Sequence, residues 1–161
     1  MCSHILWISE FIQYRLEELR EMNGHLGDHW PSDDDIASLA KRAGGLFIWA
    51  STACRYIDSY APKLRLSELV NNQLERNSSK RFAQLDSLYE ICLRSAGLWN
   101  DPSFCSDCRN VLGVILCARV PLSYSDIDAL LELPSDTPSC ELVSRLGCVL
   151  YVSKSEQISA T

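Results

Sequence analysis

Several features that would place this chain in a membrane or a secretory pathway are missing from its 161 residues. No apolar run reaches the roughly 20 residues that a membrane-spanning helix needs. Residues 1–11 are apolar, but they have no basic start and include Glu10, so they do not form a signal peptide. These absences predict an intracellular protein, and the cytoplasm is the location that we expect.

A basic surface is also missing. The chain carries 21 acidic against 15 basic residues, a formal net charge of −6. Its basic runs are short pairs, Lys41-Arg42 and Lys80-Arg81, which are typical of solvated helix faces. Because a polyphosphate partner has to be attracted by a local excess of positive charge, this balance argues against nucleic acid as a partner.

Motifs for catalysis are absent as well. The sequence has no G-x-S-x-G elbow for a nucleophilic serine and no G-x-x-x-x-G-K-[ST] phosphate-binding loop. The pair Gly44-Gly45 lacks both the lysine and the preceding strand of such a loop. We therefore expect no enzyme activity from this chain alone and no catalytic residue in it.

Two groups of side chains have the composition of metal sites. Cys105 and Cys108 have C-x-x-C spacing, but a zinc site needs a second ligand pair, and none stands nearby in the sequence. His25, Asp28 and His29 share a loop that no rigid helix face organises. The eight cysteines fall mostly within apolar helical patterns, where thiols pack as small hydrophobic groups. We expect no metal, and a cysteine-based metal or redox protein ranks third among the functions considered.

The apolar residues that are present, 47% of the chain, recur mainly with helical spacing. In the first half they predict helices over residues 5–19, 36–43, 46–57 and 66–74. Ser32 and Asp35 have the spacing of a capping box, Gly44-Gly45 ends the second helix, and Pro62 is expected to close the third. Residues 77–79, Asn-Ser-Ser, look like a linker between two halves, 1–77 and 78–161.

The second half predicts four helical segments followed by a β-hairpin. Helical spacing continues over residues 82–96, 108–116, 127–131 and 142–146, with a break at Asp101-Pro102 and a second capping box at Ser123 and Asp126. Residues 148–152 then alternate as a strand does, and residues 157–159 can pair back across a turn at 154–156. Three helices and a hairpin are the order of a winged helix, here ending abruptly after the second strand begins.

The order of these segments resembles fungal NACHT-type NTPases, which belong to the STAND class of signalling ATPases related to NLR immune receptors. The likeness runs from about residue 5 to residue 152. It is carried by DIASLAKRAGGLFIWA at 35–50, ACRYI at 53–57, LDSLY at 85–89, VLGVI at 111–115, PLS at 121–123 and LGCVLYV at 146–152.

The resemblance implies a mainly α fold, a helical lid subdomain (1–77) followed by a winged-helix-like domain with a short terminal hairpin (78–161). In that family these parts follow the NTPase core, fold over its bound nucleotide and help to hold the resting, ADP-bound state. Gly44, Gly45, Leu46 and Phe47 would then lie in the lid near the nucleotide, with Phe47 where relatives carry a proline. ATP or ADP would be a cofactor only when the chain is joined to that core.

The resemblance also implies the function that we place first: a non-catalytic regulatory or interaction fragment whose partner is a protein or the missing NTPase core. The alternative from the residues themselves is a free-standing winged-helix adaptor that binds protein or, with less support, DNA. Its recognition helix, near residues 139–146, offers Arg145 beside Glu141, which is poor charge for contacting phosphates.

Overall fold

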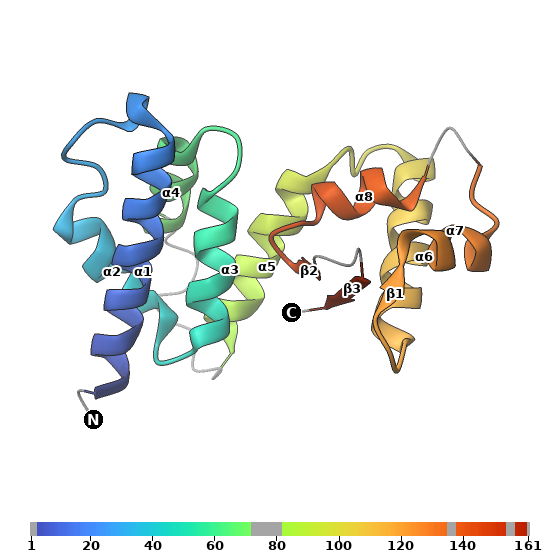
Figure 1. The fold of residues 1–161 in the computed structure, drawn as a ribbon, viewed down its shortest axis with the longest axis horizontal. Helices are drawn as coiled ribbons and strands as arrows, with labels where there is room; N and C mark the ends of the chain where they lie inside the picture. The colour runs from blue at the N-terminus through green and yellow to red at the C-terminus, as the bar shows by residue number, and fades with distance from the viewer. Residues whose placement is uncertain (1–2, 72–81, 135–137, 154–156, 161) are drawn as a thin grey trace. The chain divides into compact units, whose positions relative to one another are not determined.

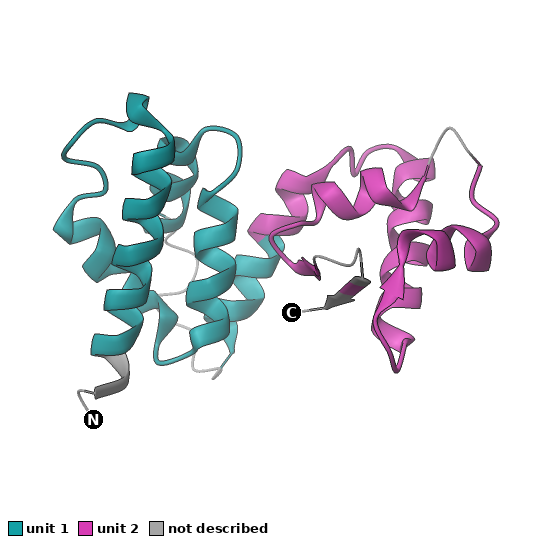
Figure 2. Cartoon of the chain, in the orientation of Figure 1, with its two compact units in different colours: residues 1–90 teal, residues 91–161 magenta. Residues whose placement is uncertain are grey.

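The computed structural model describes residues 3–71, 82–134, 138–153 and 157–160. Within them the chain is mainly helical, with eight α-helices, one 3-10 helix and three short strands (Figure 1). It divides into two compact units, unit 1 (residues 1–90) and unit 2 (residues 91–161), as Figure 2 shows. The predicted linker at residues 77–79 lies outside the described residues.

Unit 1 is a group of helices around one apolar core. It contains α1 (Ser3–Met22), η1 (Gly24–Leu26), α2 (Asp33–Ala43), α3 (Phe47–Ile57), α4 (Pro62–Asn71) and the first half of α5 (Ala83–Ala96). Apolar residues at helical spacing on each helix are buried, as the periodicity predicted. They include Ile12, Leu16, Leu39, Ala50, Ile57 and Leu69.

The start and end of α2 follow from its sequence. The Ser32 hydroxyl accepts a hydrogen bond from the Asp35 amide, and the Asp35 carboxylate accepts one from the Ser32 amide, which confirms the predicted capping box. At the other end, Gly44 adopts the left-handed conformation and donates its N–H to Lys41 O. Local chemistry therefore fixes both limits of this helix.

The prediction for Pro62 was wrong. The third helix ends at Ile57, five residues earlier, and Pro62 is the first residue of α4. Proline suits the first turn of a helix because the amide it lacks would have no partner within the helix there. At the start of α3, Phe47 is 56% exposed.

Unit 2 combines helices with a small sheet. After the second half of α5 come α6 (Pro102–Cys117), β1 (Leu122–Ser123), α7 (Tyr124–Leu131), α8 (Ser139–Arg145), β2 (Leu150–Val152) and β3 (Gln157–Ala160). Asp101 caps α6 by accepting a hydrogen bond from the Ser103 amide, and Ser123 and Asp126 form the second predicted capping box. The buried side chains of this unit include Cys108, Val111, Ile115, Ile127, Val143 and Leu146.

The predicted terminal hairpin is confirmed: β2 and β3 pair antiparallel, with Tyr151 opposite Ser159. The strand β1 was not predicted. It pairs with the other edge of β3, with Leu122 opposite Ile158, so that the sheet order is β1-β3-β2. Because β1 has two residues, its sequence cannot show the alternation of apolar and polar residues that marks a strand. It is identified only by its pairing with β3.

The first hairpin strand is shorter than predicted. Val149 and Leu150 donate their amides to Leu146 O, so the chain continues to turn after α8 and becomes extended only from Leu150. In α6, Leu116 was expected in the apolar face but is 67% exposed. None of the helices in the described part of the chain is long and apolar enough to cross a membrane.

Candidate functional site

The four residues predicted to lie near a nucleotide form the corner between α2 and α3. Gly44 has φ +56° and Gly45 φ +88°, both in the region that side chains disfavour. Leu46 donates its amide to Ala43 O at 2.8 Å. The two glycines thus let the chain reverse tightly between two helices, which needs no nucleotide to explain it.

The first turn of α3 is open at this corner. No side chain caps the helix at Leu46, whereas Ser32 caps α2. The carbonyl of Leu46 accepts the amides of Trp49 and Ala50 at 3.1 and 3.3 Å. Gly44, Gly45 and Phe47 are all exposed, so the corner presents backbone and one aromatic ring to the outside.

An exposed aromatic surface continues from the corner onto α1. The Phe47 ring lies 4.6 Å from the Phe11 ring, centroid to centroid, with the planes tilted by 53°. Trp7 and Tyr14 share the Phe11 face of α1, because residues four and three positions apart lie on one side of a helix. Their side chains are 69% and 64% exposed. We call Trp7, Phe11, Tyr14 and Phe47 the aromatic face.

The corner is attached to the rest of unit 1 through contacts with α4 and α5. The buried Trp49 donates its indole N–H to Gln84 O at 3.0 Å, and a Cβ on Gly44 would lie 3.4 Å from Gln84 Oε1. Arg42, near the end of α2, donates to Val70 O at 3.0 Å. Contacts from both α4 and α5 therefore hold the corner in one position.

Sequence reasoning found the corner but missed the aromatic face. Phe11 lies within the helix predicted over residues 5–19, and in the structure it is half-buried against Phe47. The signal was nevertheless present, since Trp7, Phe11 and Tyr14 have i, i+4, i+7 spacing. Only the packing of α3 beside α1 shows that this second stripe borders the predicted site.

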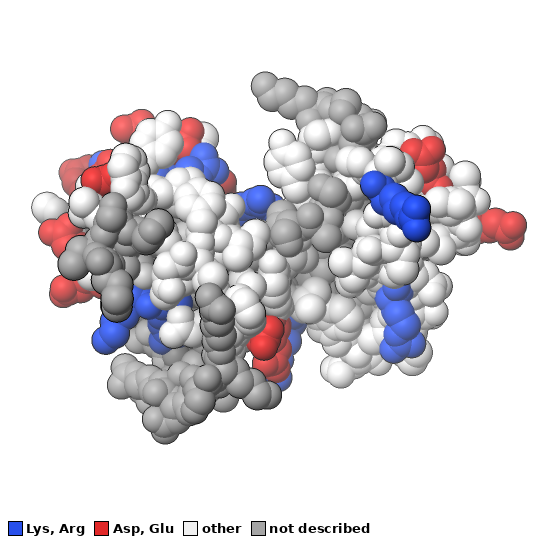
Figure 3. Space-filling view, turned by 90° about the horizontal axis from the view of Figure 1, so that it is seen from below, with Lys and Arg blue, Asp and Glu red and all other residues white. Residues whose placement is uncertain are grey.

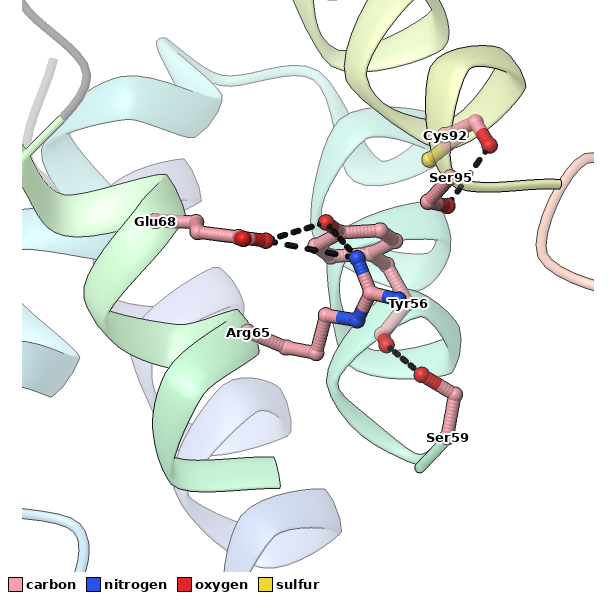
Figure 4. A network of polar contacts seen from close by, with 6 residues as sticks. All are labelled: Tyr56, Ser59, Arg65, Glu68, Cys92 and Ser95. Atoms are coloured by element: carbon pink, nitrogen blue, oxygen red, sulfur yellow. Dashed lines mark hydrogen bonds and ion pairs between the residues drawn. The ribbon is translucent and has the colours of Figure 1, made fainter. Parts of the chain in front are cut away.

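A polar network joins α3 to α4 on another side of unit 1. The buried Tyr56 hydroxyl donates to the Glu68 carboxylate and accepts a hydrogen bond from Arg65, whose guanidinium also lies 4.8 Å from the ring centroid (Figure 4). Loss of solvent and the hydrogen bond to Glu68 raise the pKa of Tyr56 to about 12. This arrangement satisfies the buried Tyr56 hydroxyl and identifies a structural connection between two helices.

The candidate metal residues remain separate in the structure. Among the described residues, no three or more His, Cys, Asp or Glu side chains are grouped so that they could hold a metal ion. Cys105 donates its thiol to Trp99 O at 3.2 Å, and Cys108 is buried, which raises the pKa of its thiol. The Cys108 thiol therefore serves as part of the apolar packing of α6.

The charges on one face of the molecule are seen in Figure 3. Among the described atoms visible there, Lys and Arg occur in separate small groups, with Asp and Glu groups between and around them. In α8, Arg145 forms an ion pair with Glu141 at 3.0 Å. This arrangement leaves little net positive charge on α8 for contacting phosphates.

Comparison with known proteins gives one distant relative. The chain is 26% identical over 151 residues to the vegetative incompatibility protein HET-E-1 of Podospora anserina, an alignment that covers 90% of this chain and 10% of that protein. No protein-family model and no solved structure matches the chain. The chain thus spans about a tenth of the length of its curated relative and is distantly similar to part of a much longer fungal protein.

Proposed function

We propose that this chain is a non-catalytic regulatory or interaction fragment of a NACHT-type STAND signalling ATPase, which packs on a nucleotide-binding core. The observation that carries the proposal is the similarity to HET-E-1, because it extends over 90% of the chain and so includes both compact units. It agrees with the family that the order of sequence segments resembles. No enzyme activity of the chain itself is part of the proposal.

The topology of unit 2 supports its assignment as a winged helix. The helices α6, α7 and α8 precede the β2–β3 hairpin, and β1, between α6 and α7, pairs with β3. Apart from β1, this is the element order that the resemblance implied for the second domain. In the proposal, unit 2 is the winged-helix subdomain and unit 1 is the helical lid.

The α2–α3 corner and the aromatic face support a packing role for unit 1. Exposed aromatic side chains that adjoin one another are characteristic of surfaces that bind another protein. Trp7, Tyr14 and Phe47 are all more than half exposed, although each could contribute substantial apolar area to an interface. We propose that the nucleotide-binding core covers this surface in the full-length protein.

Binding of the chain to the regions of HET-E-1 that flank its matched segment tests the proposal. We expect binding by isothermal titration calorimetry, weakened at least about tenfold by Phe47→Ser, because a central aromatic contact contributes more than about 1.4 kcal/mol. Leu116→Ser, at an apolar residue of unit 2 that is also more than half exposed, is the matched control. Absence of binding, or equal binding by the Phe47→Ser variant, would reject the proposal.

The alternative, a winged-helix adaptor that binds DNA, makes an opposite prediction. Such binding would draw on several Lys and Arg contacts to phosphates and would weaken steeply as salt rises. The ion pair of Arg145 with Glu141 leaves α8 poorly suited to that role. Fluorescence anisotropy with a labelled duplex at low salt distinguishes the two: we expect no binding, and tight, salt-sensitive binding would favour the adaptor.

A further inference from the structure

A cleft of about 570 Å³ lies in unit 1, at the far end of α3 from the α2–α3 corner. It is lined by the end of α1 and η1 on one side and by residues 58–62, which connect α3 to α4, on the other. Figure 1 shows both segments at the same end of unit 1. The volume falls within the range of sites that bind small molecules, about 300–1,000 Å³.

Three side chains that line the cleft have unused polar groups. Within the described part of the chain, the side chains of His25, Asp58 and Tyr60 make no hydrogen bond or ion pair. Their polar atoms are therefore available to a molecule that enters the cleft.

The cleft is rich in hydrogen-bond acceptors. Asn23 donates its side-chain amide to Leu19 O at 3.0 Å, which leaves its Oδ1 as an acceptor. Ser59 donates its hydroxyl to Tyr56 O at 2.7 Å (Figure 4), so its oxygen can still accept. Together with the Asp58 carboxylate, these groups suit a ligand that carries several N–H donors.

The electrostatics favour a positive ligand at Asp58. Partial removal of water raises the pKa of this carboxyl group. The positive charge of Arg15 lowers the pKa, and the negative charge of Glu18 raises it further. Arg15 is itself paired with Glu18 one helical turn away, so it does not serve Asp58 alone. A bound cation would supply the direct ion pair that the Asp58 carboxylate lacks.

The loop that carries Asp58 also presents an aromatic ring in an unusual backbone setting. Tyr60 is 93% exposed, and the next residue, Ala61, has φ +63°, a conformation that side-chain-bearing residues rarely adopt. Ala61 O accepts the Arg65 amide at 3.1 Å and so begins α4. A strained loop held by a helix places Tyr60 at the edge of the cleft, where an aromatic face can attract a cation.

We propose that this cleft binds a primary alkylammonium group. Asp58 forms an ion pair with the ammonium group, Asn23 and Ser59 accept hydrogen bonds from it, and the Tyr60 ring covers it. The group is either that of a small polyamine or that of an exposed lysine side chain in a peptide. The site is independent of the proposed packing role, since it uses none of the residues of the α2–α3 corner or the aromatic face.

Titration of the ¹⁵N-labelled chain, observed by NMR, tests this site. One arm uses spermidine and the other the peptide acetyl-Gly-Lys-Gly-amide; the same peptide with an acetylated lysine is the uncharged control. We expect saturable shifts of the amides of residues 19–26 and 58–61 in at least one charged arm, and the arm that saturates identifies the source of the ammonium group. The acetylated peptide should leave these amides unchanged.

Variants make the assignment specific. Asp58→Asn should weaken binding about tenfold or more, because it removes the ion pair with the ammonium group, and Tyr60→Ala should weaken it several-fold. Glu10→Gln removes the same charge from an exposed position on α1 outside the cleft and should have no effect. Failure of both charged ligands to shift these amides at millimolar concentration, or equal binding by Asp58→Asn and the natural chain, would overturn the proposal.

Discussion

Gly97 and Gly113 of unit 2 differ in what a methyl group at each position would meet. A Cβ at Gly97 would lie 2.0–2.7 Å from the ring of Phe104, which itself packs edge-on against Trp99. A Cβ at Gly113, in the middle of α6, would meet nothing within 4 Å. The first glycine is required by packing, and the second is not.

This contrast predicts opposite effects of one substitution. Gly97→Ala should lower the free energy of unfolding by about 1–3 kcal/mol, because the Phe104 ring must move out of its packed position. Gly113→Ala should raise it by about 0.5–1 kcal/mol, since alanine favours the helix. Urea denaturation followed by circular dichroism measures both. An unchanged or raised stability of Gly97→Ala would contradict the packing at Gly97, and a loss in Gly113→Ala would contradict the open space at Gly113.

Tyr56 makes the stability of unit 1 depend on pH in the alkaline range. Its pKa in the folded chain is raised to about 12, from an ordinary value near 10, so the folded state holds this proton more tightly than the unfolded state does. The stabilisation is fully present below about pH 10 and is lost as pH rises toward 12.

The Tyr56→Phe variant tests this dependence directly. It should be less stable at pH 7 by about 1 kcal/mol, through loss of the hydrogen bonds to Glu68 and Arg65, and it should lose less stability than the natural chain between pH 10 and 12. Urea titrations at a series of pH values give the comparison. Parallel curves for the two proteins would show that Tyr56 does not titrate as described.

At the scale of elements, one carboxylate connects α7 to the start of α8. Asp128 on α7 accepts the amide of Ser139 at 2.8 Å, at the first residue of α8. Ser139 is fully buried, and its hydroxyl donates to Tyr124 O at 3.3 Å. A side chain of one helix thus accepts a hydrogen bond from a buried amide that has no partner within the next helix.

Removal of this acceptor should destabilise unit 2. Asp128→Ala leaves a buried amide without its partner and should cost about 1–2 kcal/mol, whereas Asp128→Asn keeps an oxygen in place and should cost less. Thermal unfolding of both variants checks this, with Asp107→Ala, on α6, as a control for loss of an acidic side chain. Equal losses for the Ala and Asn variants would mean that the charge, not the hydrogen bond, matters.

The elements that could be predicted are those set by local chemistry. Two capping boxes, at Ser32 and Ser123, mark helix starts correctly because both partners lie within four residues. The start of α4 at Pro62 and the strand β1 depended on information that a short segment does not contain. Proline both ends and begins helices, and β1 is extended only because β3, some 35 residues later, pairs with it.

At the scale of the whole molecule, the α2–α3 corner could be predicted from the sequence, whereas the surfaces around it could not be predicted in full. The Gly44-Gly45 turn could be found from the sequence, since glycine is the residue that tolerates these dihedral angles. The spacing of Trp7, Phe11 and Tyr14 was also visible in the sequence, but their contact with Phe47 was not, and neither was the cleft, because only tertiary packing brings these segments together. The position of the aromatic face beside the corner gives the proposed function its most specific consequence.

The most direct test of the central claim, that this chain covers a nucleotide-binding core, is the dependence of binding on nucleotide. We would titrate the chain into the HET-E-1 regions that flank its matched segment, loaded with ADP or with a non-hydrolysable ATP analogue, and measure both affinities by calorimetry. A fragment that holds the resting state must bind the ADP form more tightly, by about tenfold for each 1.4 kcal/mol of coupling. Equal affinities for the two forms, or no binding to either, would contradict the account.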